Sequence, residues 1–221
     1  MHIALNGWFW DQPHTGSGQY LRHLLNALCA LAPQNRYTLI TPRHLRTLDA
    51  LPPEVDVLPV RGRVSGHLGK MLFEQRGYPR ALARLRADVA HVPYWAPPLR
   101  SPIPVVCSVL DVIPLVIREY RTGLLNRAYT SLVTAAARGA AQIVTISDAS
   151  RDDIIAQIGV PPERVSVTYL AADRAFHPEG DRQADAAART RYGLDDVDDF
   201  VLYLGSYNAH KNLHLLLAAY T

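Results

Sequence analysis

Two glycines flank a serine at the predicted start of the first helix, in the stretch GSG at 16–18. A helix start presents free backbone N–H groups and the positive end of the helix dipole, and both attract anions. Glycine lets a ligand approach the backbone closely because it has no Cβ atom. Gly16, Ser17 and Gly18 are therefore candidates for holding a phosphate. A plain strand-to-helix turn that needs a flexible residue explains them equally well.

A glycine and a lysine repeat this arrangement near the end of the sequence. Gly205 ends an apolar run, and Lys211 follows in the loop before the next predicted helix. Lysine occurs only at 70 and 211, and its ammonium group is a good point-charge partner for phosphate. The alternative for Lys211 is an ordinary solvated side chain.

Strand and helix patterns alternate around these residues. We expect strands at 2–6, 37–41, 54–60, 88–92, 104–110, 141–147 and 164–170. We expect helices over 17–32, 68–86 with a restart at Pro79, 119–138, and 148–158 after a Ser147 cap. This alternation predicts an α/β fold with a doubly wound, Rossmann-like, mostly parallel sheet.

Such a sheet binds ligands at the carboxyl ends of its strands. We therefore expect the loops at 7–17, 91–103 and 110–118 to open at one common edge. The strand that starts at His2 should lie near the middle of the sheet.

The composition changes after Phe176, which divides the sequence into three parts. Residues 1–176 read as one Rossmann-like domain. Residues 177–199 are polar and rich in Asp and Arg, so they indicate a linker with one exposed helix turn. A buried strand, a glycine and a helix restart over 200–221, which predicts the opening of a second, incomplete Rossmann-like domain.

The overall charge argues against a nucleic-acid partner. The formal net charge is only +3, and no basic run is interleaved with aromatic residues as a nucleic-acid groove requires. A mild excess of this kind fits an anionic small molecule or a membrane surface. Four arginines on one predicted helix either approach an anionic membrane or form a solvated face: Arg76, Arg80, Arg84 and Arg86.

Cysteine usage and apolar runs predict a cytoplasmic protein. Cys29 and Cys107 fall within apolar patterns and read as buried thiols in a reducing compartment. The first strand begins at His2, so we expect no signal peptide, and no apolar run reaches the length of a membrane span. The expected location is the cytoplasm, at most peripheral to the inner face of the membrane.

Six stretches occur in an order that matches a known family. They are GSGQYLRHLL from 16, FEQRGYPRALARLRADVAHVPYWAPP from 73, LDVIPL from 110, IVTISDASRDDI from 143, VPPERVSVTYLAADRAFHP from 160 and LYLGSYNAHKNLHLLLAAY from 202. Each motif alone is weak, whereas six in the right order are strong. Together they resemble the group 1 (family 4) retaining glycosyltransferases of the GT-B fold.

The resemblance implies two Rossmann-like domains that face a cleft. The first, here 1–176, would bind the acceptor, and the second, beginning at 200–221, would bind a nucleotide sugar. The implied reaction moves a hexose, such as mannose, from a nucleotide-diphosphate sugar to a glycan or lipid-linked acceptor with retention and without a metal or other cofactor. Gly16, Ser17 and Gly18 would line the cleft, and Gly205 and Lys211 would contact the donor phosphates.

The aromatic residues Trp8, Phe9 and Trp10 precede the glycine turn. They either stack on an acceptor or pack under the loop. If Gly18 lines the cleft, its replacement by valine should lower turnover and leave the melting temperature nearly unchanged.

The sequence departs from the family pattern at several positions. Leu110 stands where the family usually has a histidine that bonds the donor sugar, and Ser206 stands where many members have an arginine. His91 is then either a cleft residue or a satisfied strand-end histidine. Asp111 is either a base or an anchor of its own loop.

The family's paired glutamates, E-x7-E, do not occur within 1–221. We expect the catalytic acidic pair beyond Thr221 and an inactive protein when the 221 residues stand alone. The alternative interpretation is a non-catalytic Rossmann-like module that binds a sugar or a nucleotide.

Overall fold

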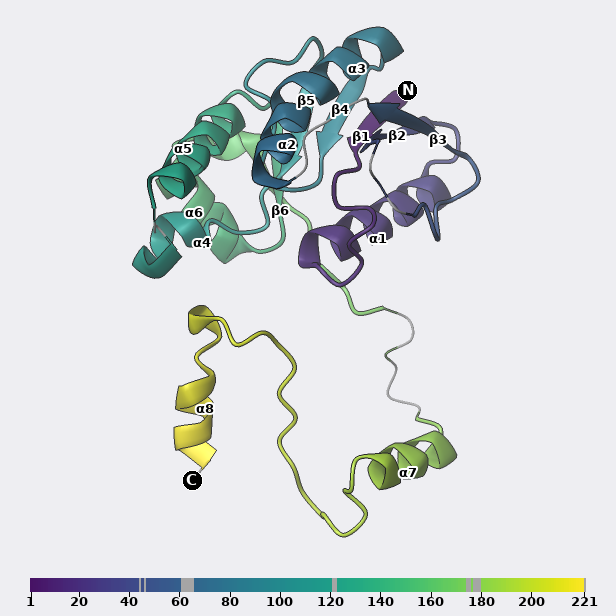
Figure 1. The fold of residues 1–221 in the computed structure, drawn as a ribbon, viewed down its shortest axis with the longest axis vertical. Helices are drawn as coiled ribbons and strands as arrows, with labels where there is room; N and C mark the ends of the chain where they lie inside the picture. The colour runs from purple at the N-terminus through teal and green to yellow at the C-terminus, as the bar shows by residue number, and fades with distance from the viewer. Residues whose placement is uncertain are drawn as a thin grey trace. The chain divides into compact units, whose positions relative to one another are not determined.

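The computed structural model describes residues 1–43, 45, 47–60, 66–120, 123–173, 176 and 180–220. The chain divides into two compact units, Met1–Tyr169 and Leu170–Thr221 (Figure 1). Each unit is described here by itself.

Seven short strands of the first unit pair in parallel to form one sheet. They are β1 His2–Asn6, β2 Arg36–Pro42, β3 Val55–Val60, β4 Val89–Val92, β5 Val105–Ser108, β6 Gln142–Thr145 and β7 Val165–Val167. Their order across the sheet is β3-β2-β1-β4-β5-β6-β7. The chain therefore winds outward from β1 in one direction and from β4 in the other. This confirms the predicted doubly wound sheet with the first strand near its middle.

Helices cover the sheet from both sides. They are α1 Gly16–Leu31, α2 Gly66–Leu72, α3 Tyr78–Leu85, α4 Ile113–Val116, α5 Leu124–Arg138 and α6 Asp148–Ile158. Alternate residues of a strand point to opposite faces. Leu5 packs with Leu21 and Leu25 of α1, whereas its neighbour Ala4 packs with Leu82 of α3. Figure 1 accordingly shows α1 and α3 on opposite sides of the central strands.

The predicted helix over 68–86 is a run of three segments. A π-helical turn, Phe73–Gly77, connects α2 to α3, and Pro79 lies in the first turn of α3. Proline is tolerated there because the first N–H groups of a helix have no partner within the helix. Helix α6 has the predicted bounds, and the Ser147 hydroxyl accepts the N–H of Ser150 at 3.1 Å as its cap.

The helix predicted over 119–138 begins later than expected. α5 starts at Leu124, and a separate 3-10 turn, Arg118–Tyr120, precedes it. Gly123 lies between them with a φ of +80°, a left-handed value that no α-helix continues through.

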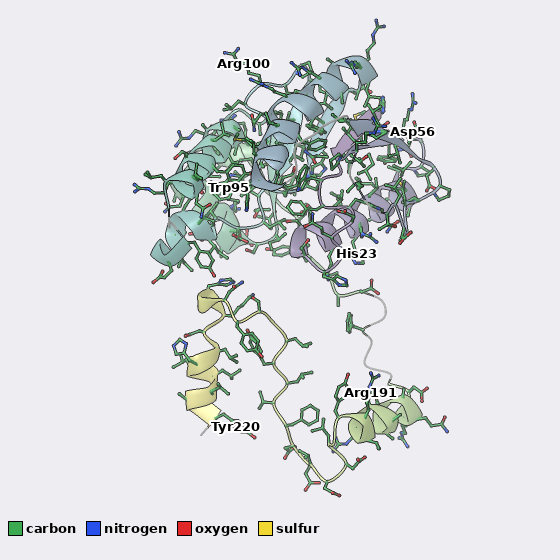
Figure 2. The ribbon with its side chains drawn as sticks, viewed as in Figure 1. His23, Asp56, Trp95, Arg100, Arg191 and Tyr220 are labelled. Atoms are coloured by element: carbon green, nitrogen blue, oxygen red, sulfur yellow. The ribbon has the colours of Figure 1, made fainter. Side chains whose placement is uncertain are left out.

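The described part of the second unit contains two helices, α7 Arg182–Arg191 and α8 Leu213–Tyr220, and a 3-10 turn, Ala209–Lys211. α7 is longer than the single turn expected between 177 and 199. Its sequence is rich in alanine, and the Asp181 carboxylate caps it by accepting the N–H of Gln183 at 2.9 Å. Figure 2 shows Arg191 at the end of α7 and Tyr220 at the end of α8, and both side chains are exposed.

The strand predicted from residue 200 is not formed. Residues 200–204 have no strand structure, and Leu202 and Leu204 are exposed. A strand is stable only when its backbone groups pair with a neighbouring strand. The described part of the second unit offers no such neighbour, so the apolar pattern alone does not produce the element.

None of the helices in the described residues is both long and apolar enough to cross a membrane.

Gly18 lies where α1 passes directly over the preceding loop. A Cβ atom on Gly18 would lie 2.0 Å from the carbonyl oxygen of Gln12 and 2.9 Å from that of Phe9. Both contacts are to backbone, and the Gln12 N–H donates to the Phe9 carbonyl at 3.1 Å, which holds the loop in place. Any larger residue must displace this loop. The expectation that Gly18 can be replaced without loss of stability is therefore wrong.

We predict that replacing Gly18 with alanine lowers the free energy of unfolding by about 1–3 kcal/mol, because the new methyl group overpacks the turn. Gly16 is the matched control, since a Cβ there meets nothing within 4 Å and its backbone is not left-handed. Gly16→Ala should change stability by less than about 1 kcal/mol. Urea denaturation compares the two variants, and equal stabilities would contradict the close approach.

Candidate functional site

The candidate site is the edge of the sheet at which the strands end. β1, β4 and β5 are neighbours and run parallel, so the loops that follow them leave from the same edge. This confirms the prediction that 7–17, 91–103 and 110–118 open together. We call this region the carboxyl edge.

Of the predicted residues Gly16, Ser17 and Gly18, the glycine turn presents only the first two to the surface. Gly16 is exposed and Ser17 is half-buried, whereas Gly18 is buried under the turn. Thr15 caps α1, because its hydroxyl accepts the N–H of Gly18 at 3.1 Å and donates to the Gln12 carbonyl at 2.9 Å. The surface of this helix start is thus formed by Gly16 and Ser17, and Gly18 serves the close packing beneath them.

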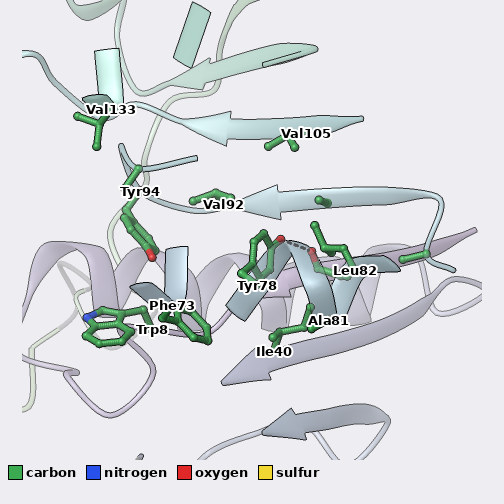
Figure 3. Packing of buried hydrophobic residues seen from close by; sticks show 14 residues of the cluster. Trp8, Ile40, Phe73, Tyr78, Ala81, Leu82, Val92, Tyr94, Val105 and Val133 are labelled. Atoms are coloured by element: carbon green, nitrogen blue, oxygen red, sulfur yellow. Dashed lines mark hydrogen bonds between the residues drawn. The ribbon is translucent and has the colours of Figure 1, made fainter. Parts of the chain in front are cut away.

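The aromatic residues before the turn pack under the loop, which was one of their two expected roles. Trp10 is fully buried, and Trp8 lies against Phe73 with the ring centroids 5.4 Å apart. Figure 3 shows Trp8, Phe73 and Tyr94 together near the ends of the strands. The Arg22 guanidinium donates to the Trp10 carbonyl at 2.7 and 2.9 Å, which ties α1 to this loop.

His91 is a buried residue of β4. Its Nε2 atom lies 2.9 Å from the Ser108 hydroxyl, which in turn donates to the Tyr20 hydroxyl at 3.1 Å. Burial lowers the pKa of His91 to about 4, so the ring is neutral at pH 7. The structure thus matches the second of its two interpretations, a satisfied strand-end histidine. Tyr20 and Ser108 were not among the predicted site residues, although Tyr20 belongs to the quoted stretch that begins at Gly16.

Asp111 anchors the loop that follows β5. Its carboxylate accepts the N–H of Ile113 at 3.1 Å, two residues farther along the chain. This local bond, typical of aspartate in turns, sets the start of α4. Asp111 itself is exposed.

An ion pair that was not among the predicted site residues, Lys70 with Glu74, spans α2 and the π-helical turn. The Lys70 ammonium donates to the Tyr129 hydroxyl at 2.6 Å, and that hydroxyl donates to the Glu74 carboxylate at 3.0 Å. The Glu74 side chain has no exposed surface, and the Lys70 side chain is 19% exposed. The signal in the sequence was the i, i+4 spacing of the two charges.

The local environment acts on both members of this pair. Burial lowers the pKa of Lys70 and raises the pKa of Glu74, while the attraction between the two charges opposes both shifts. The Glu74 carboxylate also lies near the Tyr94 hydroxyl. That hydroxyl makes no hydrogen bond with any of the described residues.

The predicted donor-phosphate residues belong to the second unit. Lys211 ends the 3-10 turn and is exposed, and its backbone N–H donates to the Asn208 carbonyl at 2.9 Å. Gly205 is exposed, and a Cβ there would lie 2.8 Å from the Tyr203 hydroxyl. No cluster of three or more metal-ligating His, Cys, Asp or Glu side chains occurs in the described parts of either unit.

The four predicted arginines all lie exposed along α2–α3 and just beyond it: Arg76, Arg80, Arg84 and Arg86. Exposure is common to both of their interpretations, a solvated face and a contact with anionic lipid.

We predict that His91 makes the first unit less stable as the pH falls from 6.5 toward 4. In this window an unfolded chain binds a proton at His91 that the folded state excludes, which costs up to about 3 kcal/mol at the acid end. His91→Gln removes this contribution and should flatten the decline in urea-unfolding free energy between pH 7 and 4.5. Burial also lowers the pKa of His2. Because His2 is present in both proteins, its contribution to the pH dependence cancels in the comparison. Parallel pH profiles for the two proteins would show that His91 is not buried as described.

A curated protein of known name resembles this chain in sequence. A curated relative, an alpha-D-kanosaminyltransferase from Streptomyces kanamyceticus, is 28% identical over 190 residues. That match takes in 80% of this chain and 48% of the relative, so the chain spans about half the length of the curated protein.

Solved structures share the fold. WaaG, a glycosyltransferase involved in lipopolysaccharide biosynthesis, superposes with a TM-score of 0.71 at 15% identity, over 98% of this chain and 58% of WaaG. Anabaena HepE in complex with UDP and glucose gives a TM-score of 0.62 at 17% identity, over 99% of this chain and 57% of HepE. These identities support a shared fold alone.

The family model for Glycosyltransferase Family 4 matches residues 14–176. The matched range begins just before α1 and takes in β2 to β7, together with His91, Asp111 and the Lys70–Glu74 pair. The chain therefore belongs to glycosyltransferase family 4.

Proposed function

We propose that this chain supplies the acceptor side of a retaining glycosyltransferase. The enzyme moves a hexose from a nucleotide-diphosphate sugar to a glycan or lipid-linked acceptor. The single observation that carries the proposal is the family match over 14–176, because it covers nearly all of the sheet whose carboxyl edge forms the candidate site.

The ligands bound in structurally similar proteins suggest the class of sugar donor. HepE from Anabaena has been solved with UDP, with UDP and glucose, and with UDP-glucose. The curated relative is named a kanosaminyltransferase. UDP-sugars are therefore the first donors to test, and the second unit, with Gly205 and Lys211, is our proposal for the start of the donor side.

The described groups of the carboxyl edge suit a binding wall better than an acid–base pair. His91 is neutral and bonded to Ser108, and Asp111 is engaged with the backbone of Ile113. Gly16 and Ser17 offer the start of a sixteen-residue helix to an acceptor. Our proposal assigns this edge the task of orienting the acceptor, which by itself can lower a reaction barrier substantially.

We expect the full-length protein to transfer a labelled sugar from at least one member of a panel of UDP-, dTDP- and GDP-sugars to a glycan or lipid-linked acceptor. The anomeric coupling constant of the product, measured by proton NMR, should show the configuration of the donor. The 221-residue chain is the matched control and should transfer nothing, because the proposed donor side is incomplete in it. A product of inverted configuration would refute retention. Nucleotide-sugar binding without any transfer would favour the alternative of a non-catalytic binding module.

Asp111 offers a test of the binding-wall assignment. Asp111→Asn keeps an oxygen that accepts the Ile113 N–H, so kcat/KM of the full-length protein should stay within about threefold of wild type, whereas Asp111→Ala loses the bond and should cost about tenfold. Steady-state kinetics with a saturating donor measure both variants. If the carboxylate were the base of the reaction, the asparagine variant would be as impaired as the alanine variant.

A further inference from the structure

The Lys70 ammonium lies against three aromatic rings that come from three separate segments. Its Nζ atom is 4.8 Å from the ring centroid of Tyr94, 5.1 Å from that of Tyr129 and 5.6 Å from that of Phe9. These distances are within the range of cation–π attraction. Phe9 belongs to the loop after β1, Tyr94 to the loop after β4 and Tyr129 to α5. One largely buried cation therefore touches the loops after β1 and β4, both at the carboxyl edge.

Stability alone does not account for this ion pair. Removing two charges from water is costly, and well-packed apolar residues often stabilise a core as well as a buried pair does. Glu74 lies in the π-helical turn, where the wider helix changes the direction of its side chains. The turn places the carboxylate in contact with both Lys70 and Tyr129. The chain thus carries a buried charge and an irregular helix at the same point.

A continuous series of contacts leads from Lys70 to the start of α1. Phe9 and Tyr94 pack edge to face with their centroids 4.9 Å apart. The Phe9 carbonyl accepts the Gln12 N–H at 3.1 Å, and the Gln12 carbonyl accepts the Thr15 N–H at 3.0 Å. Thr15 then caps the helix at Gly18. The position of Phe9 therefore sets the position of the turn that carries Gly16 and Ser17.

The residue beside Glu74 holds the second loop. The Gln75 amide donates to the Pro97 carbonyl at 3.2 Å and accepts the N–H of Leu99 at 2.9 Å. The dipeptide Glu74-Gln75 thereby acts on the loops after β1 and β4 at once, one through Lys70 and the other directly.

We propose that Lys70 and Glu74 are positioning residues of the acceptor wall. Glu74 holds the Lys70 ammonium against both Phe9 and Tyr94, and this cation draws the loops after β1 and β4 into the arrangement that receives the acceptor. The inference rests on the proposed function for its catalytic consequence. Its structural part concerns the first unit alone.

The test uses Lys70→Met, Glu74→Gln and the double variant in the full-length protein. Each single variant leaves one buried charge unpaired, so its Tm should fall. The double variant contains no unpaired charge and should recover a Tm near that of wild type. Its KM for the acceptor should nevertheless stay raised by up to about tenfold, because the cation that holds the two rings is gone. KM for the donor should not change.

Tryptophan fluorescence gives a second measurement that does not depend on catalysis. The three tryptophans of the chain, Trp8, Trp10 and Trp95, lie in the same two loops. Acrylamide should quench their emission more strongly in the double variant than in wild type. The control is Arg36→Met with Asp56→Asn, which removes an exposed ion pair of 2.8 Å between β2 and β3, where Asp56 lies at the surface (Figure 2). This control should leave both the quenching and the acceptor KM unchanged.

A double variant with wild-type acceptor KM and wild-type quenching would overturn the proposal. So would a double variant as unstable as the single ones, since the pair would then serve stability alone. If wild-type protein transfers no sugar, the proposed function fails, and the quenching comparison still decides whether Lys70 positions the loops.

Discussion

The placement of β1 between β2 and β4 is the constraint on which the rest of the first unit depends. β1 pairs in parallel with both neighbours, with Ile3 opposite Tyr37 on one side and opposite Val89 on the other. The winding direction of the chain reverses at this point, so α1 covers one face of the sheet and α3 the other. The same pairing brings the loops after β1 and β4 together, although more than eighty residues separate their strands. Without it, the glycine turn, the aromatic residues and Lys70 would not share a region.

The carboxyl edge is also where the described residues leave polar groups unsatisfied. Five buried side-chain atoms there have no hydrogen-bond partner in the described structure: Asn6 Nδ2, Trp10 Nε1, Tyr94 OH, Trp95 Nε1 and Thr145 Oγ1. Each of these residues ends a strand or lies in a loop that follows one. Buried polar groups are normally paired, and exceptions concentrate where function competes with stability.

Two neighbouring glycines illustrate how similar residues take different roles. Gly16 is exposed with free space around it, whereas Gly18 is required because α1 crosses the backbone of Gln12. The helix start can lie this close to the preceding loop only because Gly18 has no Cβ atom. Gly16 is under no such constraint, because a Cβ atom there would meet nothing within 4 Å.

The sequence by itself determined the α/β class, the doubly wound parallel sheet and the family. These follow from local periodicity, from caps such as Ser147 and from motif order, all of which are written in consecutive residues. Even the bounds of α6 were predictable, because its cap and its apolar spacing lie within a dozen positions.

Only the tertiary structure decided the roles of the individual site residues. The burial of His91 depends on Ser108 and Tyr20, the clash at Gly18 depends on a loop that turns back, and the Lys70–Glu74 pair depends on Tyr129 of a distant helix. The apolar run from residue 200 shows the same dependence. Its local pattern is typical of a strand, but no strand forms because no neighbouring strand is present in the described part of the second unit. A side chain's pKa, its exposure and its partners are set by segments far away in the sequence. Local spacing carries no information about which of those segments come to lie beside it.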